Sequence, residues 1–288
     1  MSEDDAALRR ERRGASQRVL RRRRRLLFGG LAVALLAVVV VAALAYRHFH
    51  NPAPAPPPEP ELRTITLTIP EGYNRGQTAE LAREAGLKGS YLKASRGHEG
   101  FLFPDTFELE RGAPASDLVG LQIEDFKRRI SGVKMAYARS KNLTTRDVVT
   151  IASMIEREAG LASQRKLVAA VIYNRLHEGI PLGIDATVRF ATGNYARPLT
   201  ESELAVDSPY NTRVNAGLPP GPIDSPGLAS IEAAAHPAKV GYLYYVTEPG
   251  TCGKLSFSKT AAEFEADVAR YNEARAAAGG NSPDTCEE

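Results

Sequence analysis

Tryptophan is absent from the 288 residues, and aromatic residues make up only 7% of the chain. The sequence also lacks a Gly-x-Ser-x-Gly elbow, a phosphate-binding loop and a His-Glu-x-x-His helix. These absences argue against α/β-hydrolase esterases, P-loop nucleotide enzymes and zinc proteases of the usual type. The histidines at 98, 177 and 236 do not have metal-ligand spacing, so we expect them to be structural. Neither a metal nor an organic cofactor is indicated.

Outside the first 25 residues, acidic side chains slightly outnumber basic ones. That segment holds ten arginines against four acidic residues, so the remaining chain is net acidic although the whole chain carries +3. A nucleic-acid-binding protein is expected to present a basic face on its folded part. The composition therefore argues against nucleic acid as a partner.

Charge is absent altogether from residues 26–46, which are rich in Leu, Val and Ala. About 20 apolar residues span a bilayer as one helix. Five arginines, Arg21 to Arg25, precede this segment, and the positive flank of such a helix stays in the cytoplasm. We expect residues 1–25 to be cytoplasmic, 26–46 to anchor the chain and 47–288 to be exported. The alternative is a cleaved signal peptide ending near Ala45, although the apolar stretch exceeds the usual signal core.

Cysteine occurs only twice, at Cys252 and Cys286. Both lie in the part expected to be exported, where disulfide bonds persist. Pairing would tie the C-terminal tail to the loop at residue 250. The alternative is two unpaired thiols, and we expect no catalytic role for either.

The folded part follows a proline-rich spacer, 47–61, which is expected to be semi-rigid. Alternation predicts a strand at 63–69, and a short helix at 77–85 follows. Further helices are expected at 116–130, 145–159, 163–178 and 260–278, with a long loop at 207–227 and strands at 243–246 and 255–258. Ser116 and Thr144 are the expected caps, and Asp147 completes a capping box with Thr144. Helices in the middle with short strands around them favour the α+β class.

One helix carries a candidate catalytic group. Between 148 and 160 the apolar residues form a stripe, and Glu156 lies at its edge beside Val149 and Ala152. Glu158 falls about 200° away at roughly 100° per residue, so the two carboxylates are expected to diverge. A glutamate half-buried near a helix C-terminus suits general acid–base chemistry. The alternative is a solvated acid on an ordinary amphipathic helix, which helix geometry alone favours.

Several short segments stand out together, namely Ile69-Pro70-Glu71-Gly72, Glu99 to Thr106, Ala152 to Glu158, Tyr173 to Leu176, Asp185 to Val188, Ser208 to Thr212, Gly217 to Ile223 and Ala233 to Ala238. In this order they resemble the YceG-like endolytic murein transglycosylases, and the resemblance covers about 64 to 273.

This resemblance implies a membrane-anchored lyase that cuts nascent peptidoglycan strands internally. In that family one glutamate, matched here by Glu156, acts as acid and then as base. The muramyl C6 hydroxyl attacks C1 and leaves a 1,6-anhydro end, so a second carboxylate is not required as it is in most glycosidases. It also implies a LysM-like unit at 62–98, a catalytic domain at 99–275 and a tail at 276–288. Candidates for shaping the sugar cleft are Glu158, Asp185, Thr187, Tyr210, Asn211 and Thr212.

Two departures from the family concern substrate binding. Gly183-Ile184 stands where relatives often have Gln-Ser, and the region before the catalytic part is short. The expected partners are glycan strands, the membrane and assemblies with wall synthases (penicillin-binding proteins). Two rival functions remain at this point, a non-catalytic peptidoglycan-binding scaffold and a muramidase-type hydrolase.

Overall fold

The computed structural model describes residues 29–31, 34–50 and 64–283. The chain divides into two compact units, Met1–Glu61 and Leu62–Glu288. The expected cytoplasmic tail, most of the proline-rich spacer and residues 284–288 lie outside the described residues. The two units are described separately below.

The described part of the first unit is a helix, Gly29–His50, of 22 residues. Its length and composition are sufficient to cross a membrane, and none of its apolar window is buried inside the protein. Leu36 and Val41, for example, are more than half exposed. A helix that is apolar all round and uncovered by protein is typical of a lipid-facing segment. The expected span therefore has a helical counterpart, displaced a few residues toward the C-terminus.

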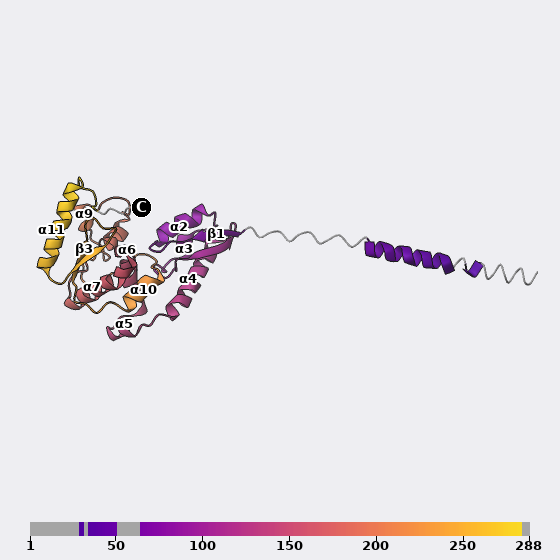
Figure 1. Ribbon diagram of the computed structural model, residues 1–288, viewed down its shortest axis with the longest axis horizontal. Helices are drawn as coiled ribbons and strands as arrows, with labels where there is room; N and C mark the ends of the chain where they lie inside the picture. The colour runs from indigo at the N-terminus through magenta and orange to yellow at the C-terminus, as the bar shows by residue number, and fades with distance from the viewer. Residues whose placement is uncertain (1–28, 32–33, 51–63, 284–288) are drawn as a thin grey trace, which may run out of the picture. The chain divides into compact units, whose positions relative to one another are not determined.

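The second unit begins with a small core built on a two-stranded sheet (Figure 1). Strand β1 pairs antiparallel with β2, and Thr64 lies opposite Glu110. Alternation along both strands turns Leu67, Phe107 and Leu109 inward. Helices α2, α3 and α4 cover this face. The bounds are β1 Thr64–Thr68, α2 Arg75–Glu84, α3 Tyr91–Ala94, β2 Thr106–Glu110 and α4 Ala115–Ser131.

This core differs from the sequence expectation in its elements. Because β2 and α4 belong to it, one packed cluster runs from Leu67 to Val119, across the boundary predicted between residues 98 and 99. The strand β2 was not predicted, since its five residues follow a proline-containing segment without a long alternating pattern. Ser116 is not the cap of α4, because Pro114 occupies the N-cap position and no side chain caps the helix.

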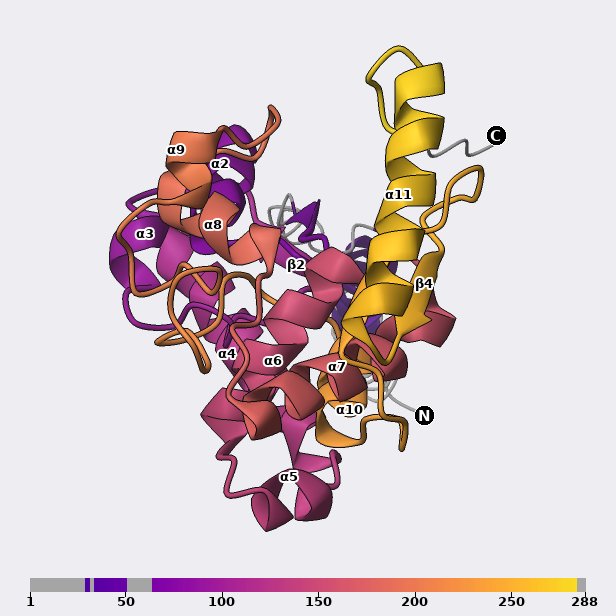
Figure 2. The same cartoon turned by 90° about the vertical axis from the view of Figure 1, so that its left-hand side faces the viewer.

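A larger core surrounds three helices, α6, α7 and α10, which lie together at the centre of Figure 2. Thr144 and Asp147 form the expected capping box of α6, and Gly179 ends α7 in the left-handed conformation with φ 67°. Helix α6 ends at Glu158, with Ala159 as its extended cap. The bounds are α5 Ala136–Ser140, α6 Thr145–Glu158, a 3-10 turn Ala162–Gln164, α7 Arg165–Glu178 and α10 Leu228–Ala235.

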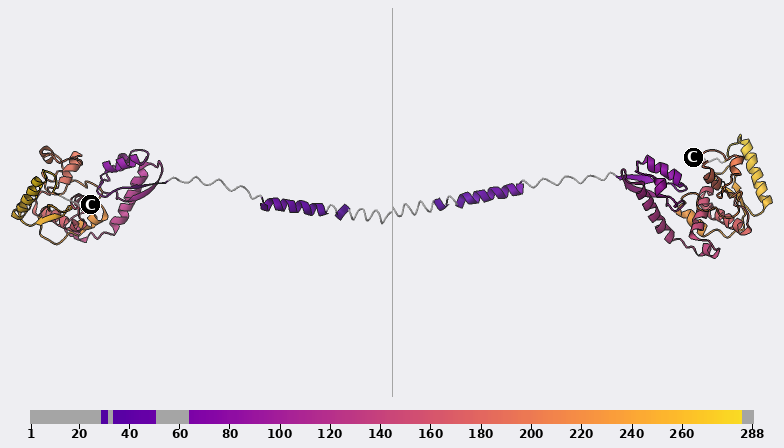
Figure 3. Two further views of the ribbon diagram at one scale, coloured as in Figure 1. Left: turned by 45° about the horizontal axis from the view of Figure 1, so that its top comes forward. Right: turned by 180° about the vertical axis from the view of Figure 1, so that it is seen from behind.

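The remaining elements border this larger core. The expected strands form a second antiparallel pair, in which Tyr244 lies opposite Ser258. Helix α11 packs on both strands, and Figure 3 shows it, in yellow, at the end of the unit opposite to the small core. Within the described residues, 205–227 holds no helix or strand, as expected for the long loop. The bounds are α8 Asp185–Thr192, α9 Glu201–Leu204, β3 Tyr244–Thr247, β4 Leu255–Ser258 and α11 Ala261–Ala277.

Candidate active site

Glu156 lies in the last turn of α6, where the two cores of the second unit meet. Its side chain is only 8% exposed, and Oε1 lies 3.5 Å from Nη2 of Arg165 at the start of α7. The backbone N–H of Gly227 donates to Oε2 at 3.0 Å. Ala152 and Val149, one and two turns earlier, are fully buried. The predicted place of Glu156 at the edge of the apolar stripe is therefore confirmed.

A tight turn from the small core reaches the same place. Gly72 has φ 76°, and a Cβ added to it would lie 3.5 Å from Cγ of Glu156. Its N–H donates to the carbonyl of Ser225 at 2.9 Å, while Nη1 of Arg157 donates to the Gly72 carbonyl at 3.4 Å. Glu71, the preceding residue, is exposed. Its carboxylate occupies the space where a Cβ on Gly227 would stand.

Two further acids lie behind this turn. Asp224 is 2% exposed, and neither of its carboxylate oxygens has a hydrogen-bond partner among the described residues. Burial raises its pKa well above the ordinary value, and the charges of Glu156 and Glu99 add to the rise against the opposing effect of Arg157. Glu99 accepts the Arg75 N–H at 3.1 Å, and burial raises its pKa to about 7.

Glu158 points to a different part of the molecule. Its Oε2 accepts the hydroxyl of Tyr245 on β3 at 3.0 Å, and burial raises its pKa to about 6. The expected divergence from Glu156 is confirmed, because Glu156 faces Gly227 and Arg165 instead. Glu158 is nevertheless held within the fold rather than solvated on an open helix face.

The other candidates for the sugar cleft fall into two groups. Thr187, Asn211 and Thr212 are 0–1% exposed, and their side chains hold the loops together. The Thr187 and Thr212 hydroxyls lie 2.9 Å apart, and Asn211 Nδ2 donates to the carbonyls of Leu204 and Val206. The side chains of these three residues therefore bond within the fold and shape the loop, and their part in sugar binding stays a prediction.

Asp185 and Tyr210 remain accessible. Asp185 Oδ1 forms an ion pair with Nη1 of Arg213 at 2.7 Å and is 54% exposed at its side chain. The Tyr210 ring packs against Phe190 with centroids 4.8 Å apart. A hydroxyl on the long loop and a carboxylate at the start of α8 suit hydrogen bonds to a glycan. Direct sugar contact by these two residues stays a prediction.

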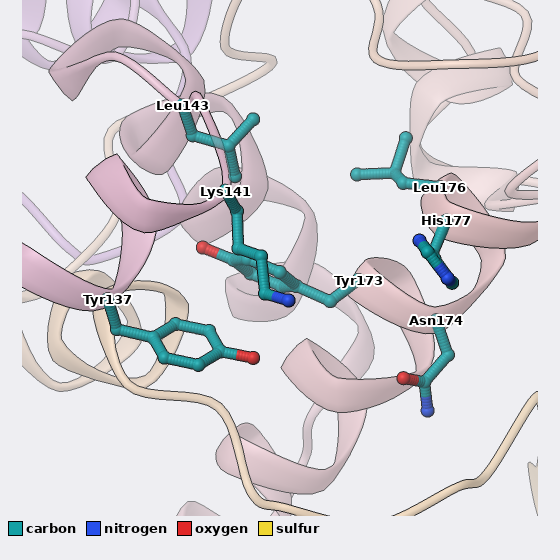
Figure 4. Close-up of a pocket in the computed structure, with 7 residues that line it drawn as sticks. All are labelled: Tyr137, Lys141, Leu143, Tyr173, Asn174, Leu176 and His177. Atoms are coloured by element: carbon teal, nitrogen blue, oxygen red, sulfur yellow. The ribbon is translucent and has the colours of Figure 1, made fainter.

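A separate hollow of about 270 Å³ opens between α5 and α7. Figure 4 shows Tyr137, Lys141 and Tyr173 close together in it, with His177 to one side. Tyr173 lies eight residues along α7 from Arg165, which corresponds to about 12 Å of helix. The hydroxyl of Tyr173 donates to the Ala234 carbonyl, so this residue also fixes α10. The hollow does not include Glu156.

The described residues contain no group of three His, Cys, Asp or Glu side chains placed to hold a metal ion. Cys252 is not a free thiol, and its expected partner Cys286 lies outside the described residues. Their pairing stays a prediction.

Comparison with known proteins identifies the family of the chain. The model of the YceG-like family matches residues 49–270, which is most of the chain. The chain belongs to the YceG-like family. An endolytic murein transglycosylase of Bacillus subtilis is 36% identical over 174 residues, covering 60% of this chain and 48% of that protein. One of Streptococcus pneumoniae is 29% identical over 248 residues, covering 72% and 44%. The chain thus spans about half the length of these curated relatives.

A solved YceG-like protein from Listeria monocytogenes has the same fold. Its TM-score is 0.65 at 29% identity, and the match covers 78% of this chain and 80% of that structure. Three residues near Glu156 were not predicted to lie at the site. Glu71 and Glu99 belong to segments that resemble the family, and Asp224 directly follows such a segment. A signal for them was present, because each lies in or next to a segment that resembles the family. Their proximity to Glu156 depends on long-range packing that residue spacing does not encode.

Proposed function

We propose that this protein is an endolytic lytic transglycosylase of peptidoglycan. It cuts the bond between N-acetylmuramic acid and N-acetylglucosamine within nascent strands and so ends their elongation. The observation that carries the proposal is Glu156. This residue occupies the family's glutamate position, and its carboxylate is buried against the Gly227 N–H at the meeting of two cores. The names of the curated relatives give the same activity.

The reaction follows from one carboxyl group used twice. Glu156 in its acid form gives a proton to the glycosidic oxygen as the C1–O bond breaks, which stabilises the departing sugar. The C6 hydroxyl of the muramyl ring attacks C1, and the Glu156 carboxylate takes the proton of that hydroxyl. The C1–O6 bond closes a 1,6-anhydro ring, and Glu156 regains its starting protonation state. Water does not enter the balance.

The rest of the chain supports a membrane-bound arrangement. The helix 29–50 anchors the protein, the arginine-rich segment before it stays cytoplasmic, and the second unit works outside the cytoplasm. The small core is the LysM-like unit and borders the cleft. Such an enzyme would act beside penicillin-binding wall synthases, whose uncrosslinked strands are its substrate.

Mass spectrometry of products decides between the lyase and a hydrolase. Full-length protein in detergent is incubated with uncrosslinked glycan strands, and the new ends are identified. We expect 1,6-anhydromuramyl ends, with shorter strands appearing from internal cuts. Reducing muramyl ends would identify a hydrolase, and uncut strands would identify a scaffold.

A further inference from the structure

Glu71 stands next to Glu156 although 85 residues separate them in the chain. The turn that carries it is held on both sides of the site. The N–H of Gly72 donates to Ser225, and the Ser225 N–H donates to Tyr73. Arg157, on the helix of Glu156, donates to the carbonyl of Gly72. These bonds fix the backbone of the turn, so the Glu71 side chain starts from a defined position.

Both carboxylates contact one glycine. The Gly227 N–H donates to Glu156 Oε2 at 3.0 Å, and a Cβ on Gly227 would lie 1.8 Å from Oε1 of Glu71. Only a residue without a side chain leaves room there for the second carboxylate. The backbone of Gly227 is ordinary, with φ −71°. Glycine at position 227 is therefore needed to make room for the Glu71 carboxylate, and not for its own backbone conformation.

Fewer positive charges than negative charges lie at the Glu71–Glu156 pair. Arg165 lies 3.5 Å from Glu156 and also acts on Glu71. Arg157 is directed to the Gly72 carbonyl and toward the ring of Tyr195, 5.9 Å away. The other acids near the pair are Asp224 and Glu99. Burial raises the pKa of both, and neither supplies a positive charge. Two carboxylates thus share essentially one guanidinium.

We propose that Glu71 is a positioning residue for Glu156: its carboxylate, held across Gly227, places a second negative charge beside the reacting carboxylate and so assists the proton exchange of Glu156. Two carboxylates that share a site do not both ionise readily. The proposal rests on the lytic function given above. It makes the small core part of the catalytic centre and not only a flanking unit.

The same charge assists the second half of the reaction. Once Glu156 has given its proton to the leaving oxygen, two anions face each other across Gly227. Their repulsion favours return of a proton to the pair, and the C6 hydroxyl supplies it as the C1–O6 bond forms. Glu71 gains and loses nothing in the net balance.

Glu71→Gln in the full-length protein tests the proposal through the pH dependence of strand cleavage. Glutamine keeps the size of the side chain and removes its charge. We expect unchanged thermal unfolding, with the falling limb of the pH–rate profile moved to lower pH by about one unit. Glu71→Asp should restore most of the profile. Glu80→Gln, an exposed acid on α2 paired with Arg83, is the matched control and should leave the profile unchanged. An unmoved limb, or an equal loss at every pH, would overturn the proposal.

A second measurement needs no substrate. Carbon-13 NMR of labelled glutamate carboxyls follows the titration of Glu71, whose signal is assigned by its loss in Glu71→Gln. Burial and the charge of Glu156 raise the Glu71 pKa, so we expect its midpoint to fall in Glu156→Gln. An unchanged midpoint would show that the two carboxylates are not coupled. If the wild-type protein leaves glycan strands uncut, the proposed function fails, and this titration still decides whether the carboxylates are coupled.

Discussion

At the scale of single residues, the glutamates of the second unit show how surroundings separate one chemical group into different roles. Glu99 accepts a backbone N–H at the start of α2, but burial outweighs that bond and raises its pKa to about 7. Glu158 is held by Tyr245. Of these three glutamates, Glu156 joins a buried side chain to both a backbone N–H and a guanidinium. That combination supports Glu156 as the proposed reacting group.

Replacing each helix glutamate by glutamine separates catalysis from packing. Glu156→Gln cannot exchange a proton and should lower strand cleavage by about 10²–10⁴-fold, the usual worth of a general acid. Glu158→Gln should retain most activity, because its carboxylate faces Tyr245 and not the cleft. Cleavage rates and thermal unfolding of both variants check this. Equal losses would show that both carboxylates serve the reaction.

The stability of the protein should depend on pH through Glu99. Its pKa is about 7 in the folded chain against an ordinary 4.5, so the folded state binds this proton more tightly than the unfolded state. Stability from this group is greatest below pH 4.5 and falls as pH rises through 7, by roughly 2–3 kcal/mol. Thermal unfolding from pH 4.5 to 8 should show a smaller decline in Glu99→Gln than in the wild type. A decline of the same size in both would exclude Glu99 as its source.

Sequence reasoning located Glu156 and its divergence from Glu158, because both depend only on the period of one helix. It did not place Glu71 beside Glu156, since that contact joins a turn of the small core to a helix 85 residues later. It also treated Thr187 and Thr212 as possible sugar contacts. Their hydroxyls are instead used by each other inside the fold, and residue type alone does not distinguish these uses.

At the scale of elements, prediction succeeded where local patterns are strong. The capping box of α6 and the glycine that ends α7 depend on a few adjacent residues. Helix α10 was not predicted, because most of its residues are buried and its run of alanines shows little polar–apolar period. Strand β2 was missed because its partner β1 lies about 40 residues earlier. Pairing at that distance leaves only a weak local signal.

The junction of two loops gives an element-scale prediction. Gly100 has φ 79°, and a Cβ there would lie 2.3 Å from Cβ of Pro222. Gly100→Ala should therefore destabilise the fold by about 3 kcal/mol through backbone strain and overpacking. Gly241→Ala has open space and should change stability by less than about 1 kcal/mol. Chemical denaturation of the two variants makes the comparison, and similar stabilities would refute the close packing of these loops.

At the scale of the whole molecule, an apolar helix precedes a unit that holds all the candidate chemistry. The helix was predictable because a charge-free run of this length has few other uses. The division of the second unit was not, because its small core is completed by elements beyond residue 98. The composition of the sequence is enough to predict a linker. The extent of a core depends on which strands pair, and composition does not show this.

Orientation in the membrane is testable with fusions at the C-terminus. Because the arginine run should remain cytoplasmic, alkaline phosphatase fused there should be active. A fluorescent protein that folds only in the cytoplasm should be dark at the same position. The reverse pattern would place the catalytic unit inside the cell and contradict the proposed function.

The bond from Gly72 to Ser225 has a consequence for anyone who recombines members of this family. A chimera that joins one parent's first hundred residues to another's remainder would pair a Pro-Glu-Gly turn with a foreign loop. The two segments would have to come from the same parent, because their backbones bond to each other. Libraries that keep 70–73 and 222–227 from a single parent should yield a larger share of working enzymes than libraries crossed between them.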